Sequence, residues 1–284
     1  MVGRGEFRGL TFHEVESRTI LNRIPRGPLP FEWTINAYRG CSHACVYCFA
    51  RATHDYLGLG IGKDFDTQIV VKVNAVELVR HETAPGRWDG SPIAMGTNTD
   101  PYQRAEGKYK LTQGIVEALV ERSNPFSILT KSPLVLRDLD LLVEGAQRAE
   151  VAVALSIGTT DEDVWKSTEP GTPHPRQRLA AVSRLADAGL SVSVLVAPIL
   201  PGISDDAVDD VVRACLEAGA ESATPIRLHL RSGVKEHYME WLRRTRPELV
   251  GMYEELYRGS AYLPRTDRPK RWEPDPRSQL SLGL

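Results

Sequence analysis

Short apolar runs alternate with amphipathic stretches along this chain, and this alternation limits the possible folds more than any other feature. Six runs have the length and residue content of strands, at residues 33–38, 92–96, 126–130, 151–156, 191–196 and 222–228. Between them apolar residues recur at helical spacing, as in Leu179, Val182 and Leu185. Strands that alternate with helices form parallel β/α units. The pattern therefore predicts an α/β protein with a partial (β/α)6 TIM-like barrel.

The barrel pattern covers residues 31–232. Residues 1–30 predict a short N-terminal lead-in with little regular structure. Residues 233–284 predict a helical C-terminal extension, with helices near residues 236–244 and 247–258 and an extended tail that begins at Pro264. Residues 69–73 fit either a further strand or an extended connection.

Composition and charge leave several classes of protein open and exclude others. With 284 residues and 42% hydrophobic content, the chain can bury a full core. A net charge of -2 neither favours nor excludes a polyanionic partner. The N-terminus mixes Arg4, Glu6 and Arg8, and no apolar stretch approaches the roughly 20 residues of a membrane span. We therefore expect no membrane partner.

Three of the four cysteines, Cys41, Cys45 and Cys48, lie in one loop after the first expected strand. In barrels of this kind the chemistry lies on the loops that follow the strands. Thiolates hold the irons of iron–sulfur clusters, and three of them leave the fourth iron of a [4Fe–4S] cluster open to a small molecule. The loop therefore predicts a cluster that can activate a ligand. Cysteines gathered in this way also favour a reducing compartment, so we expect a cytoplasmic protein.

Two other uses of the loop compete with this interpretation. A structural zinc site needs four ligands, usually in separated pairs, and His43 inside the same tight loop is the candidate for the fourth. An electron carrier needs a fourth ligand as well. The remaining cysteine, Cys215, lies on an apolar helical stripe with Val211 and Val212. A non-catalytic iron–sulfur or zinc protein is therefore the alternative from another class.

The Cys-x3-Cys-x-aromatic-Cys spacing resembles that of the radical S-adenosylmethionine (radical SAM) superfamily. Over roughly residues 10–264 the chain is similar to the branch related to spore photoproduct lyase, and it resembles an actinobacterial group within it whose substrate is unassigned. The runs that carry this resemblance are NAYRGCSHACVYCFAR at 36–51, GTNTDPYQ at 96–103, LTK at 129–131, EPGTP at 169–173 with Arg178, and APILPG at 197–202.

The resemblance implies a fold, two cofactors and a type of reaction. In such enzymes the open iron of the [4Fe–4S] cluster chelates S-adenosylmethionine (SAM), and an electron from the cluster cleaves the sulfonium. The resulting 5′-deoxyadenosyl radical removes a hydrogen atom from the substrate, while the protein orients the reactants and excludes water. A reductant such as a flavodoxin or a ferredoxin is the implied protein partner.

The resemblance assigns the cluster to Cys41, Cys45 and Cys48, and it places Tyr47 against the adenine of SAM. A core aromatic is the simpler alternative for Tyr47. The resemblance also implies SAM contacts on the loops that follow the later strands.

Thr97, Asn98 and Asp100 lie where the superfamily holds the amino group of SAM. Their run departs from the usual Gly-Gly-Glu type, and a polar turn that closes a βα loop is the alternative. Lys131 follows the third strand and could give SAM a positive contact, or it could be a surface lysine.

Three further residues complete the expected SAM site. Ser156 ends the fourth strand, where the superfamily often has a ribose contact, although a local turn would also use a serine there. Glu169 could accept a hydrogen bond from a ribose hydroxyl. Arg178 could pair with the SAM carboxylate in a fork, or it could lie on a solvated helix face.

Spore photoproduct lyases use an additional cysteine to return a hydrogen atom to the substrate radical. The stripe around Cys215 predicts a buried core thiol instead. Tyrosines are the candidates for another donor, namely Tyr38, Tyr56, Tyr102 and Tyr109.

The C-terminal part interleaves cations with aromatic residues, which include Trp241, Tyr253, Tyr257, Tyr262 and Trp272. Such a surface suits phosphate contacts and base stacking, and the alternative is a pair of solvated helices with an aromatic core. We therefore expect a radical SAM enzyme that acts on a nucleic acid, for example a damaged pyrimidine in DNA. The same chemistry on a small metabolite or a peptide is the alternative. The sequence makes no prediction of the oligomeric state.

Overall fold

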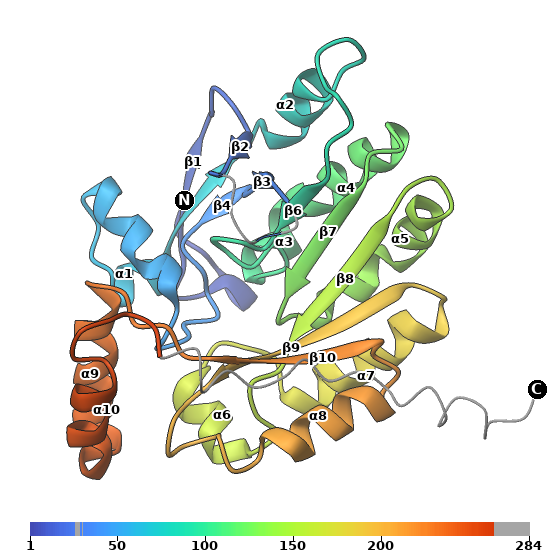
Figure 1. Ribbon diagram of the computed structural model, residues 1–284. Coiled ribbons are helices and arrows are strands. Elements are labelled where there is room, and N and C mark those ends of the chain that lie inside the picture. Colours follow the sequence, from blue (N-terminus) through green and yellow to red (C-terminus); the bar gives the residue numbers. More distant parts are fainter. Residues whose placement is uncertain (26–28, 30, 264–284) are drawn as a thin grey trace, which may run out of the picture.

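The computed structural model describes residues 1–25, 29 and 31–263. Its main sheet has seven strands, in the order β10 (Ser222–Arg227), β9 (Ser191–Ile199), β8 (Val151–Ser156), β7 (Phe126–Thr130), β6 (Ile93–Met95), β3 (Trp33–Ile35) and β2 (Leu21–Arg23). All neighbouring strands are parallel except β2 and β3. The six parallel strands lie side by side in chain order (Figure 1). This arrangement confirms the predicted partial (β/α)6 barrel.

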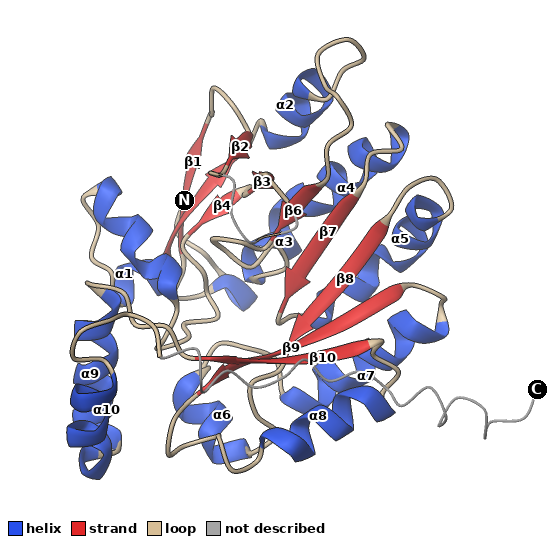
Figure 2. Cartoon of the chain, in the orientation of Figure 1, coloured by secondary structure: helices blue, strands red, loops and turns tan. Residues whose placement is uncertain are grey.

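Helices cover the outer face of this sheet, as Figure 2 shows. The ten α-helices of the described residues are α1 (Lys63–Thr67), α2 (Ala75–Glu82), α3 (Arg104–Tyr109), α4 (Leu111–Glu121), α5 (Leu139–Ala146), α6 (Glu162–Thr168), α7 (Pro175–Asp187), α8 (Val208–Glu217), α9 (Val234–Thr245) and α10 (Val250–Leu256). Shorter 3₁₀ helices span Gly5–Phe7, Phe49–Leu57, Pro133–Asp138 and Pro247–Leu249. None of the helices in the described part of the chain is long and apolar enough to cross a bilayer.

The sequence fits these elements for local reasons. Strand β9 buries Val192, Val194 and Val196 completely, because these alternate residues share the one face of the strand that packs against α7 and α8. Helix α7 begins with a capping box, in which the His174 ring accepts a hydrogen bond from the Arg176 amide while the Gln177 side chain accepts one from the His174 amide. These elements confirm the strand expected at residues 191–196 and the helix expected around Leu179, Val182 and Leu185.

The first expected strand, over residues 33–38, is divided between two sheets. Strand β3 ends at Ile35, and β4 (Tyr38–Arg39) joins a second sheet with the order β1 (Thr11–Val15), β5 (Gln68–Lys72), β4. The break has a side-chain cause: Asn36 bonds to the Thr97 hydroxyl and accepts from the Asn98 amide. The prediction of one continuous strand is wrong, and the cysteine loop leaves from β4. Residues 69–73 belong to a strand, but one outside the barrel.

The N-terminal lead-in has more regular structure than expected. It contains β1, which pairs with β5, and β2, which pairs with β3. Burial of apolar side chains explains why this segment forms regular structure, since Phe12 is 1% exposed and Ile20 is fully buried. The Glu82 carboxylate also accepts hydrogen bonds from the amides of Ile20 and Leu21. The domain boundaries at residues 31 and 233 stay predictions.

The C-terminal helices pack against the cysteine loop. One apolar cluster joins Cys45, Val46 and Tyr47 to four aromatic side chains in α9, in α10 and at the C-terminal end of α10, namely Tyr238, Trp241, Tyr253 and Tyr257. These buried rings cannot stack on bases, so for them the aromatic-core alternative is correct. Trp272 and the expected extended tail from Pro264 lie outside the described residues.

Cys215 lies fully buried in α8, between the sheet and its neighbouring helices. Burial in these apolar surroundings raises the pKa of its thiol to about 12. The core position predicted from the helical stripe is confirmed.

Replacing Lys72 with methionine is expected to stabilise the fold at neutral pH. Lys72 is 8% exposed, and desolvation, with the nearby Arg39 charge, lowers its pKa from 10.5 to about 8. Between those values the unfolded chain binds more protons than the native one, so stability rises with pH. The shift corresponds to about 3 kcal/mol at pH 7 as an upper bound. Urea unfolding should show an advantage of Lys72→Met at pH 7 that shrinks toward pH 10, and an advantage independent of pH would contradict this cause.

Candidate active site

A pocket of about 350 Å³ opens at the carboxyl ends of the barrel strands. Its wall combines the cysteine loop with residues 96–100 after β6, residues 129–131 at the end of β7, Ser156 at the end of β8, and residues 226–229 at the end of β10. Ala197 and Pro198 of β9 complete it. Loops that are distant in sequence therefore converge on one site, as predicted.

All three cysteines of the loop line this pocket, and none is in a disulfide. The chain turns tightly into the loop at Gly40, which has a φ of 80° and no room for a side chain against Phe65 O and the His54 ring. Desolvation raises the pKa of the thiols of Cys41, Cys45 and Cys48. A positively charged metal group would offset this cost by holding them as thiolates. Three free thiols around one pocket thus fit a cluster with three protein ligands.

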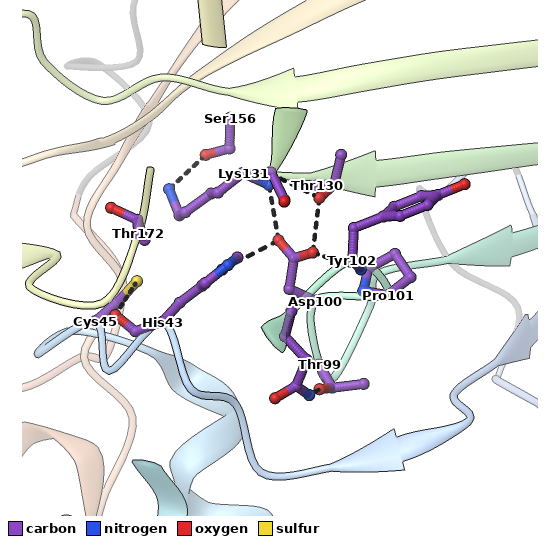
Figure 3. Close-up of polar contacts among 12 residues, drawn as sticks. His43, Cys45, Thr99, Asp100, Pro101, Tyr102, Thr130, Lys131, Ser156 and Thr172 are labelled. Atoms are coloured by element: carbon purple, nitrogen blue, oxygen red, sulfur yellow. Dashed lines mark hydrogen bonds and ion pairs between the residues drawn. The ribbon is translucent and has the colours of Figure 1, made fainter. Parts of the chain in front are cut away.

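His43, the candidate fourth zinc ligand, is engaged elsewhere. Its Nδ1 lies 3.3 Å from Asp100 Oδ2, and both side chains are buried. Figure 3 shows the ring directed at this carboxylate. The contact orients His43 toward the loop after β6, which weighs against its use as a zinc ligand.

Asp100 holds that loop in place. Its Oδ1 accepts from the Tyr102 amide at 2.9 Å and the Thr130 hydroxyl at 2.6 Å, and its Oδ2 accepts from the Lys131 amide at 2.7 Å (Figure 3). Burial alone would raise the pKa of Asp100, but His43 and these donors outweigh burial and lower it. The carboxylate is therefore occupied by protein groups. It fixes the geometry of the pocket and is not free for the expected contact with the SAM amino group.

Thr97 and Asn98 also line the pocket, and Asn36 holds both. Gln103 was not expected to matter, yet it is fully buried and joins the two loops. Its amide donates to Gly40 O at 2.9 Å, and its carbonyl accepts from the Ser42 amide at 3.0 Å. Both Asn36 and Gln103 lie within the sequence runs that resemble the superfamily, which was the signal available for them.

Lys131 points from the end of β7 into a buried network. Its Nζ lies 2.8 Å from Ser156 Oγ and 2.9 Å from Glu169 Oε1. It also lies 5.7 Å from the centre of the Tyr47 ring, whose hydroxyl donates to Glu169. Lys131, Ser156 and Tyr47 all line the pocket. The alternative of a surface lysine is therefore wrong.

Glu169 and Arg178 lie behind the pocket wall, so the expected direct contacts of both with SAM are not supported. Arg178 Nη2 donates to Glu169 Oε2 at 2.5 Å, and its Nη1 donates to Ser156 O at 3.1 Å. Their side chains are only 1% and 3% exposed, so the alternative of a solvated helix face is wrong as well. Burial would raise the pKa of Glu169, but Arg178 and Lys131 outweigh it and hold the pKa well below its usual range.

The candidate tyrosine donors lie away from the pocket. Tyr38 and Tyr102 are buried, and their hydroxyls donate to the carboxylates of Glu106 and Asp138. Tyr56 is 88% exposed, and Tyr109 donates to Glu14. Among the described residues that line the pocket, none of these four tyrosines is present.

Residues 35–215 match the family model of the Radical SAM superfamily. The chain belongs to the radical SAM superfamily. Members of this superfamily use a [4Fe–4S] cluster and SAM, so this protein is a radical SAM enzyme. An uncharacterised protein of Mycobacterium tuberculosis is 48% identical over 266 residues, which cover 93% of this chain and 78% of that protein.

More distant similarities agree with this family. A radical SAM Nα-GlyT isomerase of Pseudomonas phage M6 is 27% identical over 57% of this chain and 32% of that protein. A cysteine-to-serine variant of spore photoproduct lyase superposes with a TM-score of 0.59 at 22% identity, over 86% of this chain and 71% of that chain. Another variant, solved with AdoMet and dinucleoside spore photoproduct, gives 0.58 at 18% identity, over 92% and 86%. At these identities the two structures show that this radical SAM enzyme shares their fold.

Proposed function

We propose that this radical SAM enzyme acts on a nucleic-acid substrate, for example a damaged pyrimidine in DNA. Cys41, Cys45 and Cys48 would hold the [4Fe–4S] cluster. The observation that carries this assignment is the convergence of three free thiols with Lys131 and Ser156 on one pocket. When bound, the cluster and SAM supply a 5′-deoxyadenosyl radical that removes a hydrogen atom from the substrate.

Several residues in and behind the pocket wall have a proposed task. Lys131 would hold the SAM carboxylate, since its ammonium reaches Ser156 Oγ on the pocket wall. Thr97 and Asn98 would meet the amino group, and the Tyr47 ring would pack on the adenine. Glu169 would act as a positioning residue, because it contacts Lys131 and Tyr47 from behind.

Two observations support a nucleic acid as substrate. Structures of spore photoproduct lyase, which share this fold, contain a dinucleoside spore photoproduct. The pocket wall also carries a cation, Arg227, at the end of β10. We further propose that a flavodoxin or a ferredoxin supplies the electron and that the protein works in the cytoplasm, where reducing conditions protect free thiols.

Isotope transfer tests this function directly. Protein reconstituted under anaerobic conditions and reduced with dithionite should convert SAM to 5′-deoxyadenosine. With ultraviolet-irradiated DNA that carries deuterated thymidine, deuterium should enter 5′-deoxyadenosine, and unirradiated DNA is the matched control. DNA binding should also weaken as salt rises, since it depends on phosphates.

Two outcomes would contradict the proposal. Full iron loading without any SAM cleavage would remove the catalytic assignment. Deuterium transfer from a labelled peptide or metabolite, but not from DNA, would replace the nucleic acid by a small substrate.

A further inference from the structure

Arg227 is a cation of the pocket wall that has no counter-ion within the described part of the chain. It lies half-buried at the end of β10, and among the described residues no group forms a hydrogen bond or an ion pair with its guanidinium. Other arginines that reach inward are paired: Arg51 with Asp66, Arg137 with Glu106, and Arg178 with Glu169. Partial burial of an unpaired charge is unfavourable, so an anionic ligand is the natural partner of Arg227.

The backbone that carries Arg227 is firmly held. The Leu228 amide donates to Ile199 O at 3.0 Å, and the buried Tyr257 hydroxyl donates to Leu228 O at 2.8 Å. The guanidinium therefore extends from a backbone that hydrogen bonds hold in place, as a ligand site requires.

The carboxylate of SAM has a different proposed partner. Lys131 directly follows β7, and Arg227 ends β10, three positions away in the sheet. At about 4.8 Å per strand, the backbones that carry the two cations lie about 14 Å apart along the sheet. SAM carries a single carboxylate, so a second anion in this pocket belongs to the substrate.

Beside Arg227, the mouth of the pocket offers an aromatic surface. The ring of His229, which lines the pocket, lies 4.6 Å from the ring of Tyr262. Arg231 Nη2 donates to the Tyr262 hydroxyl at 2.6 Å, and Tyr262 remains 39% exposed. A cation next to exposed rings is the combination that binds a phosphate and a neighbouring base.

We propose that Arg227 binds a phosphodiester of the substrate strand, with the His229–Tyr262 pair supporting an adjacent base. This proposal rests on the proposed nucleic-acid function and names the group of the substrate that the pocket mouth recognises. Arg227 is thus a substrate-binding residue, separate from the proposed SAM contacts at Lys131 and Ser156.

Binding of single-stranded thymidine hexamers tests the subsite. One probe has ordinary phosphodiester linkages, and the other has uncharged methylphosphonate linkages. The reconstituted wild-type protein with SAM should prefer the charged probe by at least about tenfold at low salt. Arg227→Gln should lose this preference, whereas its SAM affinity, measured by equilibrium dialysis, and its melting temperature should not change. Arg244→Gln, an exposed arginine of α9, is the matched control and should keep the preference.

The outcomes separate two failures. If the wild type prefers the charged probe and Arg227→Gln keeps that preference, the subsite is wrong while a nucleic-acid substrate still stands. The subsite is also wrong if Arg244→Gln loses as much of the preference for the charged probe as Arg227→Gln does, because a diffuse basic surface would then explain binding. If the wild type binds neither probe, both the nucleic-acid function and the phosphodiester subsite are overturned.

Discussion

Cys45→Ala is expected to abolish both the iron–sulfur cluster and the cleavage of SAM. The variant keeps two thiols of the three that line the pocket, and two cannot hold three irons of a cluster. Anaerobic reconstitution followed by iron and sulfide analysis should give far less cluster than the wild type. Formation of 5′-deoxyadenosine after reduction should fall to the level of a control without protein.

Cys215→Ala is the matched control, because it removes a thiol that is buried in α8 away from the pocket. Its iron content and SAM cleavage should equal those of the wild type. Retention of SAM cleavage by Cys45→Ala would end the assignment of the cluster to this loop. A lone zinc ion in oxygen-free wild-type protein would do so too.

Glu169→Gln is expected to destabilise the protein strongly at neutral pH. Glu169 pairs with Lys131 at 2.9 Å and with Arg178 at 2.5 Å, and its side chain is 3% exposed. Loss of its charge leaves two inward-facing cations without compensation, which typically costs about 3–5 kcal/mol. Because Lys131 and Tyr47 lose their common partner, SAM affinity should fall as well. Urea unfolding and equilibrium dialysis measure the two effects.

The dependence on pH identifies the cause. The pKa of Glu169 is lower in the native state than in the unfolded chain, so its stabilising effect is complete above the unfolded value, about 4.3. The effect is lost as the pH falls through the native value. The gap between wild type and Glu169→Gln should therefore be large at pH 7 and begin to narrow below about pH 4.3.

Glu144→Gln provides the control for this prediction. Glu144 pairs with Arg148 on the surface of the protein, where both side chains are about half exposed. Such exposed pairs contribute about 0–1 kcal/mol. Equal destabilisation by Glu144→Gln and Glu169→Gln at pH 7 would show that the charge of Glu169 does not stabilise the fold by compensating Lys131 and Arg178.

Local residue patterns were enough to predict the barrel. Valine-rich runs such as the one in β9, separated by amphipathic stretches, left few alternatives to parallel β/α units. The division of the first strand could not be predicted in this way. It depends on the hydrogen bonds of Asn36 with Thr97 and Asn98 in the loop after β6, which are 61 and 62 positions away in the sequence.

The sequence named several residues that line the pocket, but it did not indicate the direction in which each side chain points. Lys131 and Ser156 reach the pocket, whereas Arg178 turns to Glu169 behind it. Sequence alone does not say whether a guanidinium pairs with a ligand or with a neighbouring carboxylate. The choice was made by tertiary contacts, including the one between Arg178 Nε and Pro173 O. The burial of the C-terminal aromatic rings could not be predicted from the sequence either, because these rings pack against the folded cysteine loop.

The packing of α9 and α10 against the cysteine loop has a consequence for biosynthesis. Val46 and Trp241 share one apolar cluster although almost two hundred positions separate them, as their residue numbers give. During synthesis, the outer side of the loop therefore stays uncovered until α9 and α10 have been made. A polypeptide cut before α9 would lack this apolar cover and would leave the side of the loop that carries Val46 exposed to water.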